Sequence, residues 1–170
     1  RRWELYVYFS PETPSLRTVV LRLSKSYGAG GYPGNNRNVI PHFNFKALNC
    51  ELLSITRTGE ETRDFTFIHD TVQALLLASK HADAIGATYN VASGVETKIT
   101  DLVKAIIRVC SSSSQIEYLK RREWDTVTRR CADISAIKAL GYAPTTRFDE
   151  GLALTYRWFK ANNIYQFKPI

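Results

Sequence analysis

The chain has 170 residues, of which 44% are hydrophobic and 23% are charged. These proportions are ordinary for a folded globular protein and exclude wholesale disorder, a collagen-like repeat and a coiled coil. Lysine and arginine total 23 against 16 acidic residues, a formal net charge of +7, which indicates an anionic partner. The cations are spread along the chain without a nucleic-acid-binding motif, so a small phosphate-rich ligand explains the charge more simply than nucleic acid does.

In chain order, the hydrophobic pattern predicts alternating strands and helices, which favours one α/β or α+β unit. The predicted elements are a strand at 18–23, a glycine-rich loop at 28–36, a helix at 41–49, strands at 52–55 and 65–68, a helix capped by Asp70 in a unit that ends at Gly86, a strand at 88–91, a helix from 100 or 101 to 110, a loop at 111–114, a strand at 116–119, a short helix capped by Asp133 and stopped at Gly141, and a last helix at 149–162.

Three cysteines, Cys50, Cys110 and Cys131, lie far apart in the sequence and form no C-x-x-C pair. This spacing predicts neither a disulfide framework nor a zinc site, and we expect reduced thiols in a cytoplasmic protein. No apolar run approaches the roughly 20 residues that cross a bilayer, and the first residues do not read as a signal peptide. The sequence contains no methionine, so we expect it to be a piece of a longer polypeptide.

Two short motifs are candidates for chemistry but have simpler explanations. The loop Gly28-x-Gly30-x-x-x-Gly34 follows a predicted strand, as a dinucleotide-binding turn does, yet it does not open directly into a helix. Tyr156-x-x-x-Lys160 has the spacing of a tyrosine whose pKa is lowered by a lysine, but Tyr156 falls on the apolar side of the last helix. We interpret the first as a plain loop and the second as part of a surface helix.

Two pairs of arginine and aspartate are better candidates for a ligand-binding site. They are Arg63 with Asp64 and Arg122 with Asp125. The planar guanidinium donates two parallel hydrogen bonds, which suits a diphosphate, and a carboxylate accepts from ribose hydroxyls. From the residues alone, solvated surface charges remain the more common explanation of such pairs.

Several segments, taken together and in order, match one known pattern. They are Leu21–Gly30 (compare L-R-x-x-N-x-Y-G-P-G), Asn38–Pro41 (N-x-(I/M)-P), Gly59–Asp70 (G-x-x-x-R-D-(F/Y)-(I/T)-x-V-x-D), Tyr89–Gly94 (Y-N-(V/L)-G-x-G), Arg122–Asp125 (R-x-x-D), Ala132–Ser135 (A-D-x-S) and Leu140–Pro144 (L-G-(W/Y)-x-P). From about 18 to 162 the sequence resembles the C-terminal half of the extended short-chain dehydrogenase/reductase family. More narrowly, it resembles the NAD-dependent nucleotide-sugar epimerases and dehydratases.

The resemblance implies a fold, and it implies that cofactor and substrate are bound by different halves of the enzyme. It implies an α/β fold (α+β in isolation), the C-terminal substrate-binding portion of an extended Rossmann-type enzyme. We expect 1–17 to be a lead-in and 18–170 to be the nucleotide-sugar-binding portion, with the Rossmann cofactor half missing. In the family that half holds NAD and the catalytic Tyr-x-x-x-Lys. We therefore expect a 4-epimerase or 4,6-dehydratase as the whole enzyme, compatible with a homodimer, and no turnover by this chain alone.

The resemblance also assigns roles to individual residues. It assigns Arg63 and Arg122 to the diphosphate and neighbouring ribose, and Asp125 to ribose hydroxyls. Asn38 and Val39 are assigned to the nucleotide-facing loop.

Two further positions of the expected substrate site follow from the same resemblance. Phe65 is assigned to the pocket wall, and Lys25 stands where the family has an asparagine. Ala29 replaces a proline of the family, while Arg57 and Thr58 replace the first two residues of a G-D-G turn. These departures keep an alternative open: a diverged, non-catalytic module that binds a nucleotide sugar or a partner.

Overall fold

The structure, a computed structural model, describes residues 17–34, 39–120 and 127–166. Its strands are β1 (Val20–Leu23), β2 (Lys25–Tyr27), β3 (Leu53–Thr56), β4 (Thr62–Phe67), β5 (Thr88–Val91), β6 (Glu96–Lys98) and β7 (Ile116–Leu119). Its helices are α2 (Val39–Leu48), α3 (Ile68–Lys80), α4 (Ile99–Cys110), α5 (Ser135–Ala139) and α6 (Phe148–Ala161), with short 3₁₀ turns η1 (Ala82–Ala84) and η2 (Ile164–Gln166).

The strands form three small sheets, and most pairs are parallel. β1 pairs with β5 and β3 pairs with β7, both in parallel, while the third sheet has the order β2-β4-β6. In that third sheet β2 is parallel and β6 antiparallel to β4. Parallel strands joined through helices are typical of an α/β protein, so the predicted fold class is confirmed.

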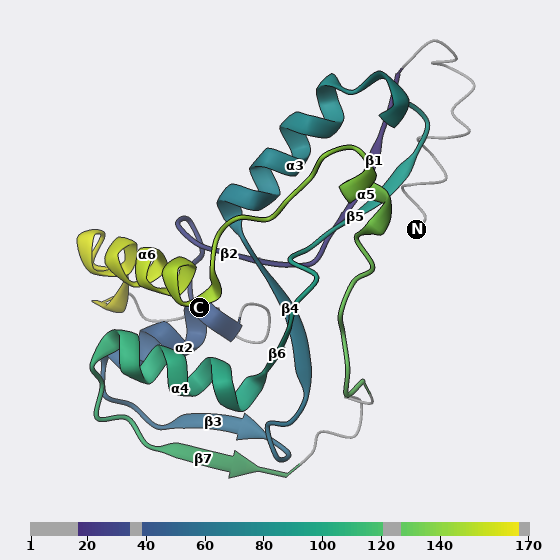
Figure 1. Ribbon diagram of the computed structural model, residues 1–170. Coiled ribbons are helices and arrows are strands. Elements are labelled where there is room, and N and C mark those ends of the chain that lie inside the picture. The colour runs from purple at the N-terminus through teal and green to yellow at the C-terminus, as the bar shows by residue number, and fades with distance from the viewer. Residues whose placement is uncertain (1–16, 35–38, 121–126, 167–170) are drawn as a thin grey trace.

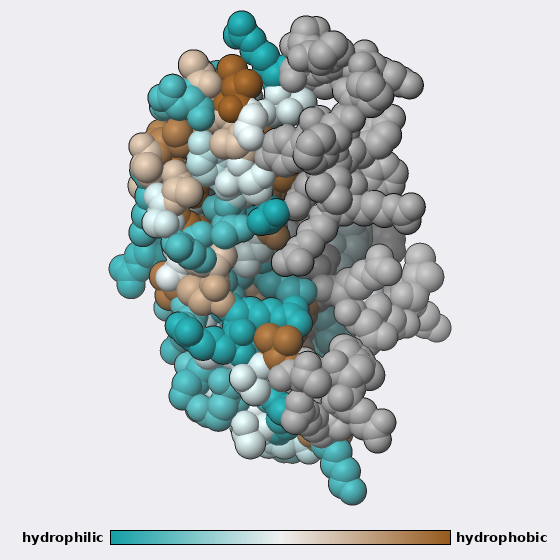
Figure 2. Space-filling view, turned by 90° about the vertical axis from the view of Figure 1, so that its right-hand side faces the viewer, coloured by the Kyte–Doolittle hydropathy of each residue, from teal (hydrophilic) through white to brown (hydrophobic). Residues whose placement is uncertain are grey.

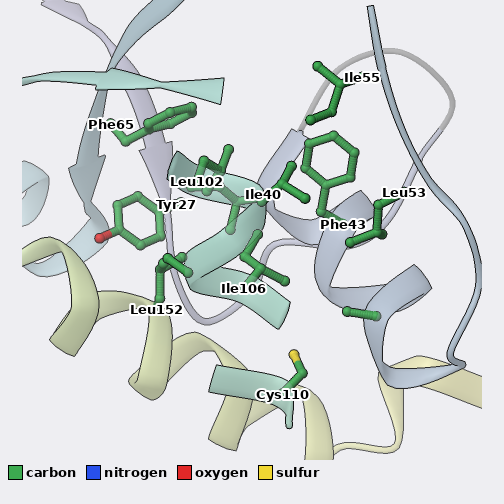
Figure 3. Packing of buried hydrophobic residues seen from close by; sticks show 13 residues of the cluster. Tyr27, Ile40, Phe43, Leu53, Ile55, Phe65, Leu102, Ile106, Cys110 and Leu152 are labelled. Atoms are coloured by element: carbon green, nitrogen blue, oxygen red, sulfur yellow. The ribbon is translucent and has the colours of Figure 1, made fainter. Parts of the chain in front are cut away.

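The larger core lies in the lower half of the molecule in Figure 1, where α2, α4 and α6 pack on one another and on β3. Figure 3 shows residues from these elements pointing toward one another, with Phe65 and Tyr27 at one end of the cluster and Leu53 and Ile55 at the other. Leu102 of α4, in this core, is fully buried. The predicted apolar face of the 100–110 helix is therefore largely confirmed.

A second core lies in the upper half of Figure 1, among β1, β5, α3 and α5. Here α3 presents small residues inward, because Ala74 and Ala78 are buried against this cluster. Its larger residues lie outside: Val72 and Leu75 are each 43% exposed and Leu76 is 53% exposed. The apolar side chains of α3 thus continue around the helix beyond the surface that is packed.

Asp70 is not the N-cap that the sequence predicted, because α3 begins two residues earlier and Phe67 occupies the cap position. Instead the Asp70 carboxylate is buried and accepts hydrogen bonds from the backbone N–H groups of Thr145 and Thr146, at 3.0 and 3.3 Å. Asp70 therefore ties the start of α3 to the segment that leads into α6.

The other differences from the predicted elements concern short strands and helix starts. β2 and β6 have three residues each and were not predicted, since so short a segment becomes a strand only through its partner. β4 begins at Thr62, so Arg63 lies inside a strand rather than before one. α2 begins at Val39, two residues before the predicted Pro41, and proline is tolerated in this first turn because its missing N–H is not needed there.

Candidate functional site

The predicted substrate residues that the structure describes come from three elements. Arg63 and Phe65 lie on β4, Lys25 lies on β2 beside Phe65 in the parallel register, and Val39 is the first residue of α2. Asn38, Arg122 and Asp125, which complete the predicted set, lie outside the described residues.

Arg63 is half-buried and its guanidinium is oriented by backbone carbonyls. Nη1 donates to Thr62 O at 2.7 Å, and Nη2 donates to Val127 O at 3.3 Å. A guanidinium has five N–H donors, so it can bind several partners at once. The side chain thus reaches from β4 to the segment that follows residue 126.

Phe65 lies at the edge of the main core rather than on an open surface. It is 5% exposed, stacks on Phe148 with ring centroids 6.0 Å apart, and meets Tyr27 edge-on at 6.5 Å. Lys25, its neighbour on β2, is exposed. The strand pair therefore offers a rigid aromatic base with one cation beside it, and the roles assigned to Phe65 and Lys25 stay predictions.

A hollow of about 560 Å³ opens beside these strands and is lined by Ser24 and by residues 129–132. The segment from 127 to 134, drawn in green, runs up the right-hand side of Figure 1 between β4 and α5. On the face shown in Figure 2, hydrophilic side chains dominate the described middle part and hydrophobic ones gather at the top. The hollow thus lies along the segment from 127 to 134, and two arginines are part of its lining.

Asp64 holds both walls of the hollow in place. It is 1% exposed, and its backbone carbonyl accepts from Ser24 Oγ at 2.9 Å. Its carboxylate accepts from the N–H of Ala132 at 3.3 Å, from the N–H of Ser93 at 2.9 Å and from the N–H of Gly94 at 3.1 Å. Two separate segments donate to the carboxylate and a third donates to the carbonyl, so Asp64 fixes these three segments relative to one another.

Two consecutive arginines on this wall have different surroundings. Arg129 pairs with Glu96 of β6, and its Nε donates to Glu96 Oε1 at 2.6 Å. This hydrogen bond, with a second from Thr62 Oγ1, lowers the pKa of the Glu96 carboxyl. Arg130 is exposed, and within the described part of the chain no carboxylate lies in ion-pair distance of it.

The other candidate motifs do not form sites. A Cβ at Gly28 would lie 2.5 Å from Ile68 Cγ2, so this glycine is needed for packing against α3. Lys160 Nζ lies 5.6 Å from the centre of the Tyr156 ring, a cation–π contact on the surface of α6.

Sequence reasoning missed the pairing of Arg129 with Glu96 and the hollow beside Arg130. The signal available was the doublet Arg129-Arg130 directly before the A-D-x-S segment, but a doublet alone is typical of a solvated surface. Within the described ranges, no helix has the length and apolar character needed to cross a membrane, and no cluster of three or more metal-ligating side chains occurs.

Comparison with known proteins gives one consistent result. The profile of the "NAD dependent epimerase/dehydratase family" matches residues 4–92, about half of the chain. The chain is 30% identical over 171 residues to UDP-glucuronic acid decarboxylase 1 of Danio rerio, covering 96% of this chain and 40% of that protein.

Solved structures agree. The epimerase Mth375 of Methanothermobacter thermautotrophicus superimposes with a TM-score of 0.92 at 35% identity, covering 98% of this chain and 51% of that one. The UDP-glucose 4-epimerase of Thermotoga maritima, solved with UDP-glucose, gives a TM-score of 0.86 at 28% identity over 94% of this chain and 51% of that one. The chain thus spans about half the length of these relatives, or less.

Proposed function

This chain belongs to the NAD-dependent epimerase/dehydratase family, and from that membership we propose that it binds the nucleotide diphosphate of a sugar substrate. We propose further that it serves an NAD-dependent nucleotide-sugar 4-epimerase or 4,6-dehydratase, with NAD and the catalytic tyrosine on the half that its relatives carry in addition. The chain alone is then expected to bind but not to turn over substrate.

The observation that carries this proposal is the placement of Arg63. It lies on β4 next to the buried Asp64. Its guanidinium donates to one carbonyl at 2.7 Å and reaches the segment after residue 126. A rigid guanidinium of this kind suits a diphosphate, since it donates two parallel hydrogen bonds without losing much side-chain freedom. The similarity to an epimerase solved with UDP-glucose supports the same ligand class.

In the proposed arrangement this chain supplies charge and position rather than proton or hydride transfer. Arg63 and Arg122 hold the diphosphate, and Asp125 accepts from the ribose hydroxyls. Asn38 and Val39 line the nucleotide loop. The hydride chemistry of such enzymes belongs to NAD, and the protein orients the substrate for it. We propose a cytoplasmic location, supported by the three free cysteines.

Calorimetric titration of the chain with UDP and with dTDP tests the binding role. We expect one of the two nucleotides to bind, and Arg63→Gln to weaken it by about tenfold or more, the size typical of one charge-assisted contact. Arg157→Gln is the matched control, because Arg157 is an exposed arginine in the second half of α6 and has no predicted role in the site. It is expected to leave the affinity unchanged.

Absence of binding to either nucleotide, or an equal loss in both variants, would contradict the proposal. The dependence of affinity on salt concentration distinguishes this role from nucleic-acid binding. A nucleic-acid binder loses affinity steeply with salt and shows no preference for a nucleotide diphosphate. Turnover assays on a version extended by the other half test the enzyme role.

The alternative, a diverged non-catalytic module, is favoured by one observation. Lys25 replaces the asparagine of the resembled family, and it is an exposed point charge rather than an amide. If the extended protein binds a nucleotide sugar but gives no turnover with NAD present, this alternative becomes the better account.

A further inference from the structure

Among the described residues, Arg130 has no carboxylate within ion-pair distance, although three other cations are paired. Arg129 pairs with Glu96, Lys98 pairs with Glu60, and Arg57 pairs with Glu61. The buried carboxylate of Asp64, whose backbone carbonyl contacts Ser24 in the wall of the hollow, already accepts from backbone N–H groups and a hydroxyl. The exposed guanidinium of Arg130 can therefore pair with an anionic ligand in the hollow.

The backbone fixes the direction in which Arg130 projects. Residues 128–130 join β4 at a parallel bridge, with Thr62 N donating to Thr128 O and Arg130 N donating to Thr62 O. Arg129 and Thr62, the bridged residues, both reach Glu96. Successive side chains of an extended segment point to opposite faces, so Arg130 lies on the face opposite to Glu96, which is also the face of Arg63.

Arg130 is also at a suitable separation from the proposed diphosphate position. Arg63 Nη2 donates to Val127 O at 3.3 Å, and Arg130 follows three residues later. Three extended residues cover roughly 10 Å, a distance that a diphosphate linkage and one pyranose ring together can span. The hollow between Ser24 and residues 129–132 is thus placed for the sugar rather than for the nucleotide.

We propose that Arg130 binds a carboxylate carried by the sugar ring, so that this site selects an acidic nucleotide sugar, of the glycuronic acid kind, over a neutral one. This inference rests on the proposed function. A neutral sugar filling the hollow would desolvate the guanidinium without compensating its charge, whereas a planar carboxylate matches its two parallel donors.

Titration of the chain with UDP, UDP-glucose and UDP-glucuronic acid tests the inference. We expect UDP-glucuronic acid to bind about tenfold more tightly than UDP-glucose, as one charge-assisted contact provides. Arg130→Gln is expected to remove this difference while leaving the affinity for UDP unchanged. Arg130→Lys keeps the charge but loses the planar fork, and it is expected to retain only part of the preference.

Arg157→Gln again serves as the control for loss of one positive charge, and it is expected to preserve the preference. Thermal unfolding confirms that Arg130→Gln is folded, which we expect because its backbone N–H, not its side chain, makes the recorded contact with β4. Equal affinity for the two sugars would overturn the inference. An equal loss for UDP itself would also overturn it, by making Arg130 a diphosphate ligand. A chain that binds none of the three ligands overturns this inference, and a chain that binds no dTDP either contradicts the proposed function as well.

Discussion

Arg57 occupies the left-handed region of backbone space, with φ of 62° in the turn between β3 and β4. A residue with a Cβ loses roughly 1–2 kcal/mol in this conformation, and glycine is the residue that avoids the loss. The side chain offsets it, because Arg57 Nη1 pairs with Glu61 Oε1 at 3.0 Å, and the two side chains are only 17% and 8% exposed. The ion pair thus stabilises a left-handed backbone conformation that glycine adopts more easily.

Replacing Arg57 by glycine is expected to destabilise the protein, although it relieves the backbone. Relief of the left-handed conformation contributes about 1 kcal/mol, but leaving Glu61 buried without its cation costs about 3 kcal/mol or more. We expect the free energy of unfolding in urea to fall by about 2 kcal/mol. In the double variant Arg57→Gly/Glu61→Gln at least half of this loss should return. No recovery in the double variant would show that the ion pair is not the stabilising element.

At the scale of elements, leucines on α3 and α4 differ in how deeply they are buried. Leu102 of α4 is completely buried in the main core, whereas Leu76 of α3 is 53% exposed. Truncating a buried leucine to alanine loses the free energy of burying its side chain and leaves a cavity. Truncating a half-exposed leucine loses less of this free energy and leaves little or no cavity.

We therefore expect Leu102→Ala to lower the free energy of unfolding by about 2–5 kcal/mol. Leu76→Ala is the matched change and is expected to stay within about 1 kcal/mol of the parent chain. Urea unfolding followed by circular dichroism measures both. Comparable losses at the two positions would mean that the outer stripe of α3 is packed rather than exposed.

These helices also show what sequence patterns predict well. The spacing of Leu102, Val103 and Ile106 predicted the buried face of α4, and all three are buried. On α3 the large residues dominate the pattern, yet Ala74 and Ala78 are the fully packed ones, Leu77 is only partly buried, and Leu75 and Leu76 are exposed. Periodicity reports which residues are apolar, and tertiary contacts decide which of two apolar stripes is packed.

The candidate site was predictable where a motif lies on one element and not where it depends on contacts. Arg63 and Phe65 belong to one sequence motif and lie on one strand, although their roles in substrate binding stay predictions. The hollow beside Arg130 was not predicted, since it forms only when Asp64 and Ser24 meet a segment more than sixty residues further along the chain. Asn38, Arg122 and Asp125 stay predictions from the resemblance.

At the scale of the whole molecule, two buried aspartates join the two cores. Asp64 of β4 binds the loop after β5 and the segment before α5, and Asp70 of α3 binds the segment before α6. Both carboxylates are only 1% exposed. The packing of the upper core against the lower one thus depends on charge-assisted hydrogen bonds as well as on apolar contact.

Asp64→Asn tests this dependence with almost no change in volume. If the amide oxygen keeps the contact with Ser93, the amide NH₂ faces the N–H groups of Gly94 and Ala132, so donors oppose donors. We expect a loss of about 3 kcal/mol in the free energy of unfolding. Asp101→Asn, at an exposed position in the first turn of α4, is the control and should cost no more than about 1 kcal/mol. Equal effects of the two changes would contradict a joining role for Asp64.

The same two carboxylates have a consequence for the timing of backbone opening. Five backbone N–H groups outside helices and strands donate to these two carboxylates. They belong to Ser93, Gly94, Ala132, Thr145 and Thr146. Loop amides ordinarily exchange their hydrogen with solvent through small local fluctuations. These five instead require a carboxylate to leave its buried position, so in deuterated water they are expected to exchange together and slowly. Hydrogen exchange would then report the separation of the two cores from positions that a ribbon drawing shows as irregular chain.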